Sequence, residues 1–360
     1  MENLGVLILG GSVSGGGGVG RVHNLTWHAQ LGPVKPVVFS KNAINPSYFL
    51  HCTDRFVTRE YDVVLLDLGP NMFGSSSGNA LEALVRKLRC LTKASSTAII
   101  NWPGALRTNA SLSAALHTNA TLINIPRLRQ LYAADKIHPN ERGHAFIAKQ
   151  VRAYLGMLTA DSIDHKSSCD VPQDEHCYQN ASELPVVGTH KHWTIVDDSI
   201  DPSTVHKFGW ATKKQGATLR LKIPKVSTCG AVATLAYLRS NTTGSFHIVC
   251  TDGCECSPIR NYDQKNVFPF PIVTGLEDCR GYKEGCKSLK VTRETSLNIL
   301  FSKDACKMNV VALKSQRVRI DGLYVQSADE KYLQYILQSR SGLTQRRFAL
   351  YALNKNCNLA

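Results

Sequence analysis

Two segments of the chain carry residue types that could together perform nucleophilic chemistry. In Leu7–Gly20, LILGGSVSGGGGVG, Ser12 follows an apolar run at a glycine turn. A serine hydroxyl is a weak nucleophile until a base takes its proton and a third group orients that base. In DKIHPNERGH, Asp135 precedes His138 by three residues, so its carboxylate can accept the Nδ1 proton and leave Nε2 free. We therefore predict Ser12 as nucleophile, His138 as base and Asp135 as the orienting acid.

A third segment offers a donor for the oxygen that becomes negatively charged during attack on a carbonyl. In DLGPNMFG, the side-chain amide of Asn71 follows a turn that begins at Gly69. The backbone N–H of Ser12 is a second candidate for this oxyanion hole. Gly11 and Gly69 are expected to shape the loops around the site.

Other glycine-rich motifs fit the first segment poorly. Gly15, Gly17 and Gly20 satisfy G-x-G-x-x-G, but no acidic residue for a ribose hydroxyl occurs from Asn3 to Thr53. No Lys-Ser or Lys-Thr follows the glycines, as a phosphate-binding P-loop requires. The G-x-S-x-G elbow is absent because Ser14 stands where its last glycine belongs. A serine at a strand-to-helix turn is what remains.

Three neighbouring residues have simpler expected roles. Ser14 is an alternative nucleophile, but it lies two residues past Ser12. Asp67 ends an apolar run and is expected to order the active-site loops rather than react. His144 is expected to pack on or cap the last helix of the domain.

Short β-rich runs alternate with helical patterns over the first 157 residues. The runs are GVLIL, KPVVFS, DVVLLDL, TAIINW and TLINI, and the clearest helical patterns are NALEALVRKLRCL and ERGHAFIAKQVRAYL. This alternation is typical of βαβ units, in which helices cover both faces of a parallel sheet. We therefore expect residues 1–157 to form a flavodoxin-like, three-layer, doubly wound α/β domain. Functional residues in such sheets gather at the carboxyl ends of the strands.

The order of these residues resembles that of the SGNH (GDSL-like) hydrolases over about residues 4–157. In that family a serine, an asparagine and a histidine follow strands one, three and five, in GDS, GxND and DxxHP blocks. The resemblance implies that Ser12 is the nucleophile, that Asn71 donates to the oxyanion, and that Asp135 and His138 complete a catalytic triad. Neither a metal nor a cofactor is implied.

Three positions depart from the family pattern. Gly11 stands where the family has the aspartate of GDS, and Met72 where it has the aspartate of GxND. The family also takes an oxyanion donor from a glycine in its second block. The corresponding segment, SKNAINPSYF, has no glycine, and Pro46 has no N–H to donate. Either a neighbouring amide, for which Asn45 is the candidate, takes this role, or the oxyanion hole has one donor fewer.

The sequence pattern changes after residue 157. Residues 158–190 are polar, contain two cysteines and are expected to form a linker. Short alternating runs such as TLRLKI, SFHIVC and VRIDGLYVQ follow over residues 191–328, which is typical of an antiparallel β-sandwich. Residues 329–360 form a basic tail with a helical period. We therefore expect two domains joined by a linker and followed by a tail.

Nine of the twelve cysteines lie between Cys169 and Cys306. Such a cluster is either a disulfide framework in an oxidising compartment or a metal site in a reducing one. Disulfides are favoured, because CTDGCEC lacks the paired CxxC knuckles of a zinc ribbon and no His-x3-His follows it.

The sequence also bears on the compartment of the protein. Glycosylation sequons occur at Asn24, Asn109, Asn119, Asn180 and Asn241 and fit a secreted glycoprotein. The N-terminus MENLGVLILGGS does not resemble a signal peptide. Two interpretations stay open: a cytosolic chain, or a chain of the secretory pathway whose leader is missing. The cysteines and sequons favour the second.

The chain is basic, with a net charge of +14. Its first 157 residues hold 16 basic and 8 acidic side chains. Because no run of Lys and Arg is interleaved with aromatic residues, nucleic acid is not an expected partner; a solvated surface or an anionic glycan fits better. The apolar runs are far shorter than the roughly 20 residues that span a bilayer, so no membrane span is expected.

The function predicted from these observations is a serine esterase that hydrolyses a carboxylic ester. By analogy, the two-domain plan points to O-acetyl groups on a glycan as one substrate class. Two alternatives stay open. A glycan O-acyltransferase would keep the same four residues and differ in its acceptor. A non-catalytic glycan-binding protein would carry a decayed site.

Overall fold

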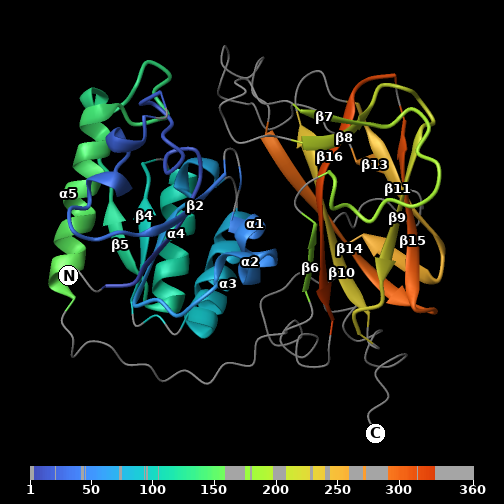
Figure 1. Cartoon of the computed structure of the whole chain (residues 1–360), viewed down its shortest axis with the longest axis horizontal. Coiled ribbons are helices and arrows are strands. Elements are labelled where there is room, and N and C mark those ends of the chain that lie inside the picture. The colour runs from blue at the N-terminus through green and yellow to red at the C-terminus, as the bar shows by residue number, and fades with distance from the viewer. Residues whose placement is uncertain are drawn as a thin grey trace, which may run out of the picture. The chain divides into compact units, whose positions relative to one another are not determined.

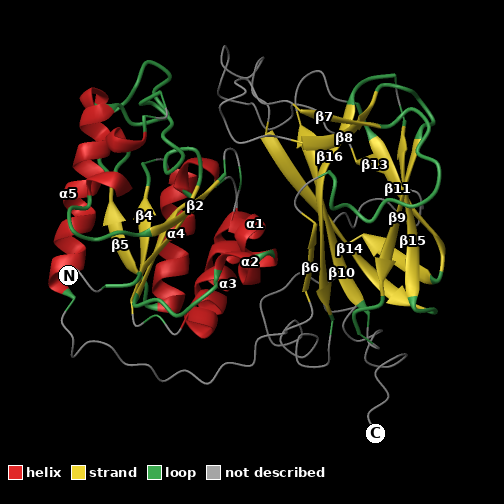
Figure 2. Cartoon of the chain, in the orientation of Figure 1, coloured by secondary structure: helices red, strands yellow, loops and turns green. Residues whose placement is uncertain are grey.

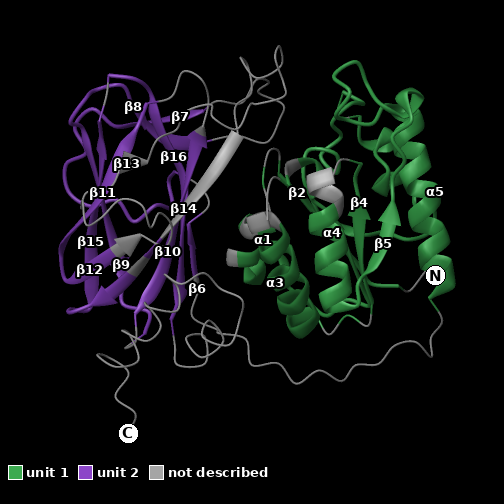
Figure 3. Cartoon of the chain, turned by 180° about the vertical axis from the view of Figure 1, so that it is seen from behind, with its two compact units in different colours: residues 1–171 green, residues 172–360 purple. Residues whose placement is uncertain are grey.

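The chain divides into two compact units, Met1–Val171 and Pro172–Ala360 (Figure 3). The computed structural model describes residues 4–328 except 21, 42–43, 45, 73–74, 93, 95, 104, 159–174, 179–180, 198–207, 228–229, 240–243, 259–270, 273–290 and 314. The division falls within the segment 158–190, for which a linker is expected. The expected tail, 329–360, lies outside the described residues.

Unit 1 is built on a parallel five-stranded sheet with the order β2-β1-β3-β4-β5 (Figure 1). Its strands are β1 Val6–Gly10, β2 Val37–Ser40, β3 Val63–Asp67, β4 Ser96–Asn101 and β5 Thr121–Asn124. Every side chain of β1 and β3 is buried, which explains their unbroken apolar runs. The predicted flavodoxin-like fold is confirmed.

Helices cover both faces of this sheet (Figure 2). The α-helices are α1 Pro46–His51, α2 Thr53–Phe56, α3 Ser75–Thr92, α4 Ala105–Thr118 and α5 Glu141–Met157. Ile147, Val151 and Leu155 of α5 share one hydrophobic cluster with Ile8 and Leu65 of the sheet. Helices α3 and α4 pack against each other, and α3 also packs against α1. Alternate strand residues thus enter two cores, one on each side of the sheet.

The connection between β1 and β2 differs from the predicted strand-to-helix turn. Residues 11–20 form consecutive turns, and two short 3-10 helices follow, η1 His23–Leu25 and η2 His28–Gln30. Glycine has a low helix propensity because folding costs its backbone the most entropy. The glycine-rich segment therefore follows a path of turns that a helix would not permit.

Unit 2 is an antiparallel β-sandwich of two sheets, as predicted. One is a seven-stranded sheet, in which β12-β14-β10-β16-β8-β7 are neighbours in this order and β6 pairs with β16; the other is four-stranded, β13-β11-β15-β9. The strands are β6 Glu175–Tyr178, β7 Thr194–Asp197, β8 Phe208–Thr212, β9 Thr218–Pro224, β10 Ala231–Arg239, β11 Phe246–Asp252, β12 Cys254–Pro258, β13 Pro271–Ile272, β14 Val291–Phe301, β15 Ala305–Ala312 and β16 Val318–Ser327. Strand β6 lies in the segment where a linker is expected.

The predicted disulfides are confirmed where the structure describes the cysteines. Unit 2 contains Cys250–Cys256 and Cys254–Cys306. Cys52, Cys90 and Cys177 are also disulfide-bonded. Cys169, Cys229, Cys279, Cys286 and Cys357 lie outside the described residues. No helix of the described chain combines the length and the apolar character that a bilayer crossing requires.

Candidate active site

The glycine turn after β1 is tied to the end of β3. The N–H of Gly11 donates to the backbone oxygen of Asp67 over 2.8 Å, and the N–H of Gly17 donates to the oxygen of Ser12 over 2.8 Å. These two bonds close the turn around Ser12. The Ser12 side chain is thereby held at the carboxyl end of a central strand, where parallel sheets place functional groups.

Two of the glycines allow another segment to approach the turn. A Cβ on Gly17 would lie 2.5 Å from Cδ2 of His138, and a Cβ on Gly18 would overlap the backbone oxygen of Pro139. Gly18 also has a φ of +91°, which favours glycine. The run of glycines therefore permits close contact with the His138–Pro139 segment.

Ser12, His138 and Asp135 form one hydrogen-bonded chain. Nε2 of His138 lies 2.9 Å from Oγ of Ser12, and Nδ1 of His138 lies 2.6 Å from Oδ2 of Asp135. The side chains of His138 and Asp135 are 27% and 46% exposed, so solvent reaches the site. The structure thus brings together all three residues that were predicted from the sequence as nucleophile, base and orienting acid.

A tight turn aims Asp135 at the histidine. Lys136 has a φ of +58°, and Oδ1 of Asp135 accepts the N–H groups of Ile137 and His138 over 2.9 and 3.0 Å. Partial burial raises the pKa of Asp135, but hydrogen bonds from the His138 ring and from these N–H groups outweigh it and lower the pKa. The carboxylate therefore stays ionised beside the imidazole.

Asp67 lies beneath the site and is fully buried. Its carboxylate accepts hydrogen bonds from Oγ of Ser14 over 2.6 Å, from Nε1 of Trp102 over 2.9 Å and from Nε1 of Trp27 over 3.3 Å. Burial raises the pKa of Asp67, and the three donors oppose that shift. Asp67 thus orders the loops, as expected, and the hydroxyl of Ser14 points to its carboxylate.

Two buried histidines brace the glycine turn. Nε2 of His144, on α5, lies 3.1 Å from the oxygen of Gly17, and Nδ1 of His144 accepts the N–H of Trp27 over 3.2 Å. Nε2 of His28 lies 2.9 Å from the oxygen of Ser14. Desolvation lowers the pKa of both histidines. His144 therefore does more than pack on the last helix, because its ring joins α5 to the turn.

The predicted oxyanion donors are only partly described. Asn71 ends the 3-10 helix η3 Gly69–Asn71, directly after β3, while its side chain and all of Asn45 lie outside the described residues. Pro46 is the first residue of α1, a position at which the missing N–H is not needed. Within the described chain, the backbone N–H of Ser12 donates to no protein acceptor.

Gly69 and two tryptophans complete the support of the site. A Cβ on Gly69 would overlap the indole ring of Trp102, which holds Asp67. Trp27, Trp102 and His28 are not predicted from the sequence. Each is an aromatic residue with a ring nitrogen that lies at the end of a strand or after a glycine-rich loop. Such residues are common in hydrophobic cores, so their positions alone do not mark a functional site.

No protein-family model and no curated protein matches the sequence. Among solved structures, the chain is similar to CEX, a two-domain esterase active on acetylated mannans that was co-crystallised with mannopentaose. The two chains are 14% identical, the match covers 90% of this chain and 92% of that one, and the TM-score is 0.58.

Two shorter structures match one part of the chain each. A putative lipolytic protein of the G-D-S-L family from Desulfitobacterium hafniense DCB-2 is 15% identical over 42% of this chain and 99% of its own, with a TM-score of 0.34. The CBM35 from Cellvibrio japonicus Abf62 is 14% identical over 43% of this chain and 94% of its own, with a TM-score of 0.28.

The chain is similar in fold to this two-domain esterase, and the strand order of its parallel sheet is that of the flavodoxin-like fold. The predicted resemblance to SGNH hydrolases is therefore confirmed at the level of the fold. Within the described residues, the only group of His, Cys, Asp and Glu side chains placed to hold a metal lies in unit 2, at Cys250, Cys254, Cys256 and Cys306.

Proposed function

We propose that the protein is a serine esterase whose catalytic triad is Ser12, His138 and Asp135. One observation carries the proposal: the unbroken hydrogen-bonded chain from Oγ of Ser12 through both ring nitrogens of His138 to Asp135. A nucleophile within reach of a base, and a base oriented by a third group, is the arrangement that activates a serine.

The reaction follows from these contacts. Nε2 of His138 takes the proton of Ser12 as Oγ attacks the ester carbonyl, and the ionised Asp135 stabilises the imidazolium that forms. The N–H of Ser12 and the amide of Asn71 bind the oxyanion, with Asn45 as the predicted third donor. The imidazolium then gives its proton to the leaving alcohol. A water molecule, activated by His138 in the same way, releases the acid and restores Ser12.

We further propose an O-acetylated glycan as the substrate. The proposal is supported by the two-unit plan, in which an α/β unit precedes a β-sandwich, and by the similar plan of an esterase active on acetylated mannans. It is also supported by exposure of the site, since a polymer must reach Ser12 from solvent. Fold similarity alone does not fix the acyl group.

The proposal extends to an oxidising compartment, such as the lumen of the secretory pathway. The disulfides support it, and so does the exposure of three sequon residues, Asn24, Asn109 and Asn119. Glycosidase treatment of the protein from its native source should increase its gel mobility if these sequons carry glycans. Unchanged mobility and unmodified sequon peptides in mass spectrometry would contradict this part of the proposal.

A labelling experiment tests the catalytic part. A fluorophosphonate probe should modify Ser12 of the wild type, and Ser12→Ala and His138→Ala should each abolish labelling and lower hydrolysis of 4-nitrophenyl acetate by several orders of magnitude. Acetate release from acetylated mannan and from deacetylated mannan as a blank then tests the substrate. A wild type that is neither labelled nor active on any ester would favour the glycan-binding alternative.

A further inference from the structure

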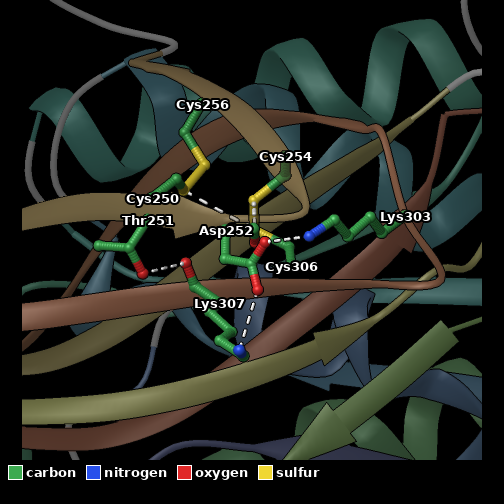
Figure 4. Close-up of a disulfide and its surroundings, with 8 residues drawn as sticks. All are labelled: Cys250, Thr251, Asp252, Cys254, Cys256, Lys303, Cys306 and Lys307. Atoms are coloured by element: carbon green, nitrogen blue, oxygen red, sulfur yellow. Dashed lines mark hydrogen bonds and ion pairs between the residues drawn. A yellow bond between two sulfur atoms is a disulfide. The ribbon is translucent and has the colours of Figure 1, made fainter.

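The sulfur atoms of four cysteines of unit 2 lie close together (Figure 4), and they come from strands of both of its sheets. Cys250 lies on β11 and Cys306 on β15 of the four-stranded sheet, while Cys254 and Cys256 lie on β12 of the seven-stranded sheet. All four Sγ atoms lie within 4.8 Å of one another. A disulfide bond or a metal ion that links sulfurs from both sheets therefore also links the two sheets.

Strand pairing fixes the backbone at these cysteines independently of the sulfur bonds. Cys250 pairs with Met308 in the four-stranded sheet, and Cys256 pairs with Ile299 in the seven-stranded sheet. The chain passes between the sheets at Gly253, whose φ is +77° and whose oxygen accepts two backbone N–H groups from the β14–β15 turn. The cluster should therefore keep its shape when the disulfides open.

The spacing of the sulfurs suits one tetrahedral metal ion. Zinc bound to four thiolates at about 2.3 Å places the sulfurs roughly 3.8 Å apart. Sγ of Cys250 and Sγ of Cys306, which are not bonded to each other, are 3.8 Å apart. In each disulfide pair, reduction replaces the bond by a non-bonded contact, and rotation of the side chains then increases the separation.

The surrounding charges favour thiolates. A tetrathiolate zinc centre carries two negative charges. Nearby, Lys303 and Lys307 both pair with the carboxylate of Asp252, over 2.6 and 2.9 Å, so these three side chains together carry one positive charge that offsets part of the charge of the centre. Cys306 is fully buried and the other three cysteines are half-buried, so the cluster lies between the core and the surface of unit 2.

We propose that the thiols of Cys250, Cys254, Cys256 and Cys306 bind one zinc ion when both disulfides are reduced. A dithiol reductant supplies two electrons and two protons to each disulfide and is itself oxidised to a cyclic disulfide. The four thiols then lose their protons to solvent as the zinc binds. The spacing C-x3-C-x-C differs from zinc-ribbon knuckles, and for this reason the site is recognised from the sheets rather than from the sequence.

The test uses the full chain, reduced with dithiothreitol in the absence of air, mixed with zinc chloride and desalted. Zinc and protected thiols are counted per chain by elemental analysis and alkylation. The wild type should retain about one zinc more per chain than Cys306→Ser. The matched control is Cys52→Ser, which removes a buried, disulfide-bonded cysteine of unit 1 and should retain as much zinc as the wild type.

Cobalt gives a second readout, because tetrahedral cobalt thiolates absorb strongly in the visible range. These bands should appear in the reduced wild type and in Cys52→Ser, and they should be lost in Cys306→Ser and in Cys250→Ser. Circular dichroism checks that the variants are folded. If Cys306→Ser, which changes a buried side chain, does not fold, Cys250→Ser is the variant compared with the wild type. Equal zinc in the wild type and both folded variants, or no zinc in the reduced wild type, would overturn the proposal.

Discussion

The hydroxyl of Ser14 donates a 2.6 Å hydrogen bond to the buried carboxylate of Asp67, 53 residues away. Two serines stand two positions apart in the same turn, but only the hydroxyl of Ser12 is hydrogen-bonded to a histidine ring. Ser14 instead belongs to the layer beneath the site, with Trp27 and Trp102. The geometry therefore separates a reactive serine from a supporting one.

The first prediction concerns this supporting layer. Ser14→Ala should remain labelled by a fluorophosphonate but should lower the free energy of unfolding by about 1.5–3 kcal/mol, the range for a hydrogen bond to a charged group. Urea unfolding checks the value. In a double-mutant cycle with Asp67→Asn, the two changes should be clearly non-additive. Loss of labelling in a stable Ser14→Ala protein would instead make Ser14 the nucleophile.

The second prediction concerns the orientation of the base. In Asp135→Asn, the amide still accepts the N–H groups of Ile137 and His138, so the turn should persist. It no longer accepts the Nδ1 proton, and His138 is left in the wrong tautomer. Ester turnover should fall by about 10³–10⁴-fold with little change in KM. An Asp135→Asn enzyme with full turnover would show that another group orients His138.

Much of unit 1 could be predicted because its information is local. Each strand of the sheet contains a short apolar run, and Asp135 and His138 are three residues apart. Helix α4 was missed because its sequence, ALRTNASLSAALHT, mixes small polar residues into the apolar stripe. The contacts of Asp67 with Trp27 and Trp102, and of Trp27 with His144, join residues 40, 35 and 117 positions apart. No local pattern pairs these residues, whereas Ser12 and His138, 126 positions apart, could be paired because the order of their motifs resembles that of a known family.

The third prediction concerns the fit of the glycine turn against the base. A Cβ at Gly17 would lie 2.5 Å from Cδ2 of His138 and 2.8 Å from the oxygen of Ser12. Gly17→Ala should displace the imidazole and reduce turnover by about 10²-fold, as expected for a shift of roughly 1 Å in a catalytic group. Gly20→Ala is the control. A Cβ there meets nothing within 4 Å, so this variant should lose about 1–2 kcal/mol of stability through its φ of +60° while keeping its turnover.

The fourth prediction concerns pH. Burial lowers the pKa of His28 and His144 in the folded chain, so the unfolded chain takes up protons first as the pH falls below about 6.5. Stability should therefore be complete above this pH and decrease as the pH falls towards the folded-state values. Thermal unfolding measured from about pH 5 to pH 8 tests this. His144→Gln should show a flatter profile, and an unchanged slope would show that His144 does not contribute.

The last prediction concerns the two disulfides that join the sheets of unit 2. Cys254 and Cys306 are 52 residues apart, whereas Cys250 and Cys256 are 6 apart. If the bonds act by restricting the unfolded chain, removing the bond that closes the long loop should lower the free energy of unfolding by ~4 kcal/mol. Removing the bond that closes the short loop should lower it by ~2 kcal/mol.

Both cysteines of a pair must be replaced by alanine together, because Sγ of Cys250 lies 3.8 Å from Sγ of Cys306 and a lone thiol would attack the remaining bond. Urea unfolding of unit 2, followed by the fluorescence of Trp210 and Trp193, measures both costs. Equal costs would show that the bonds stabilise the folded sheets rather than restrict the unfolded chain.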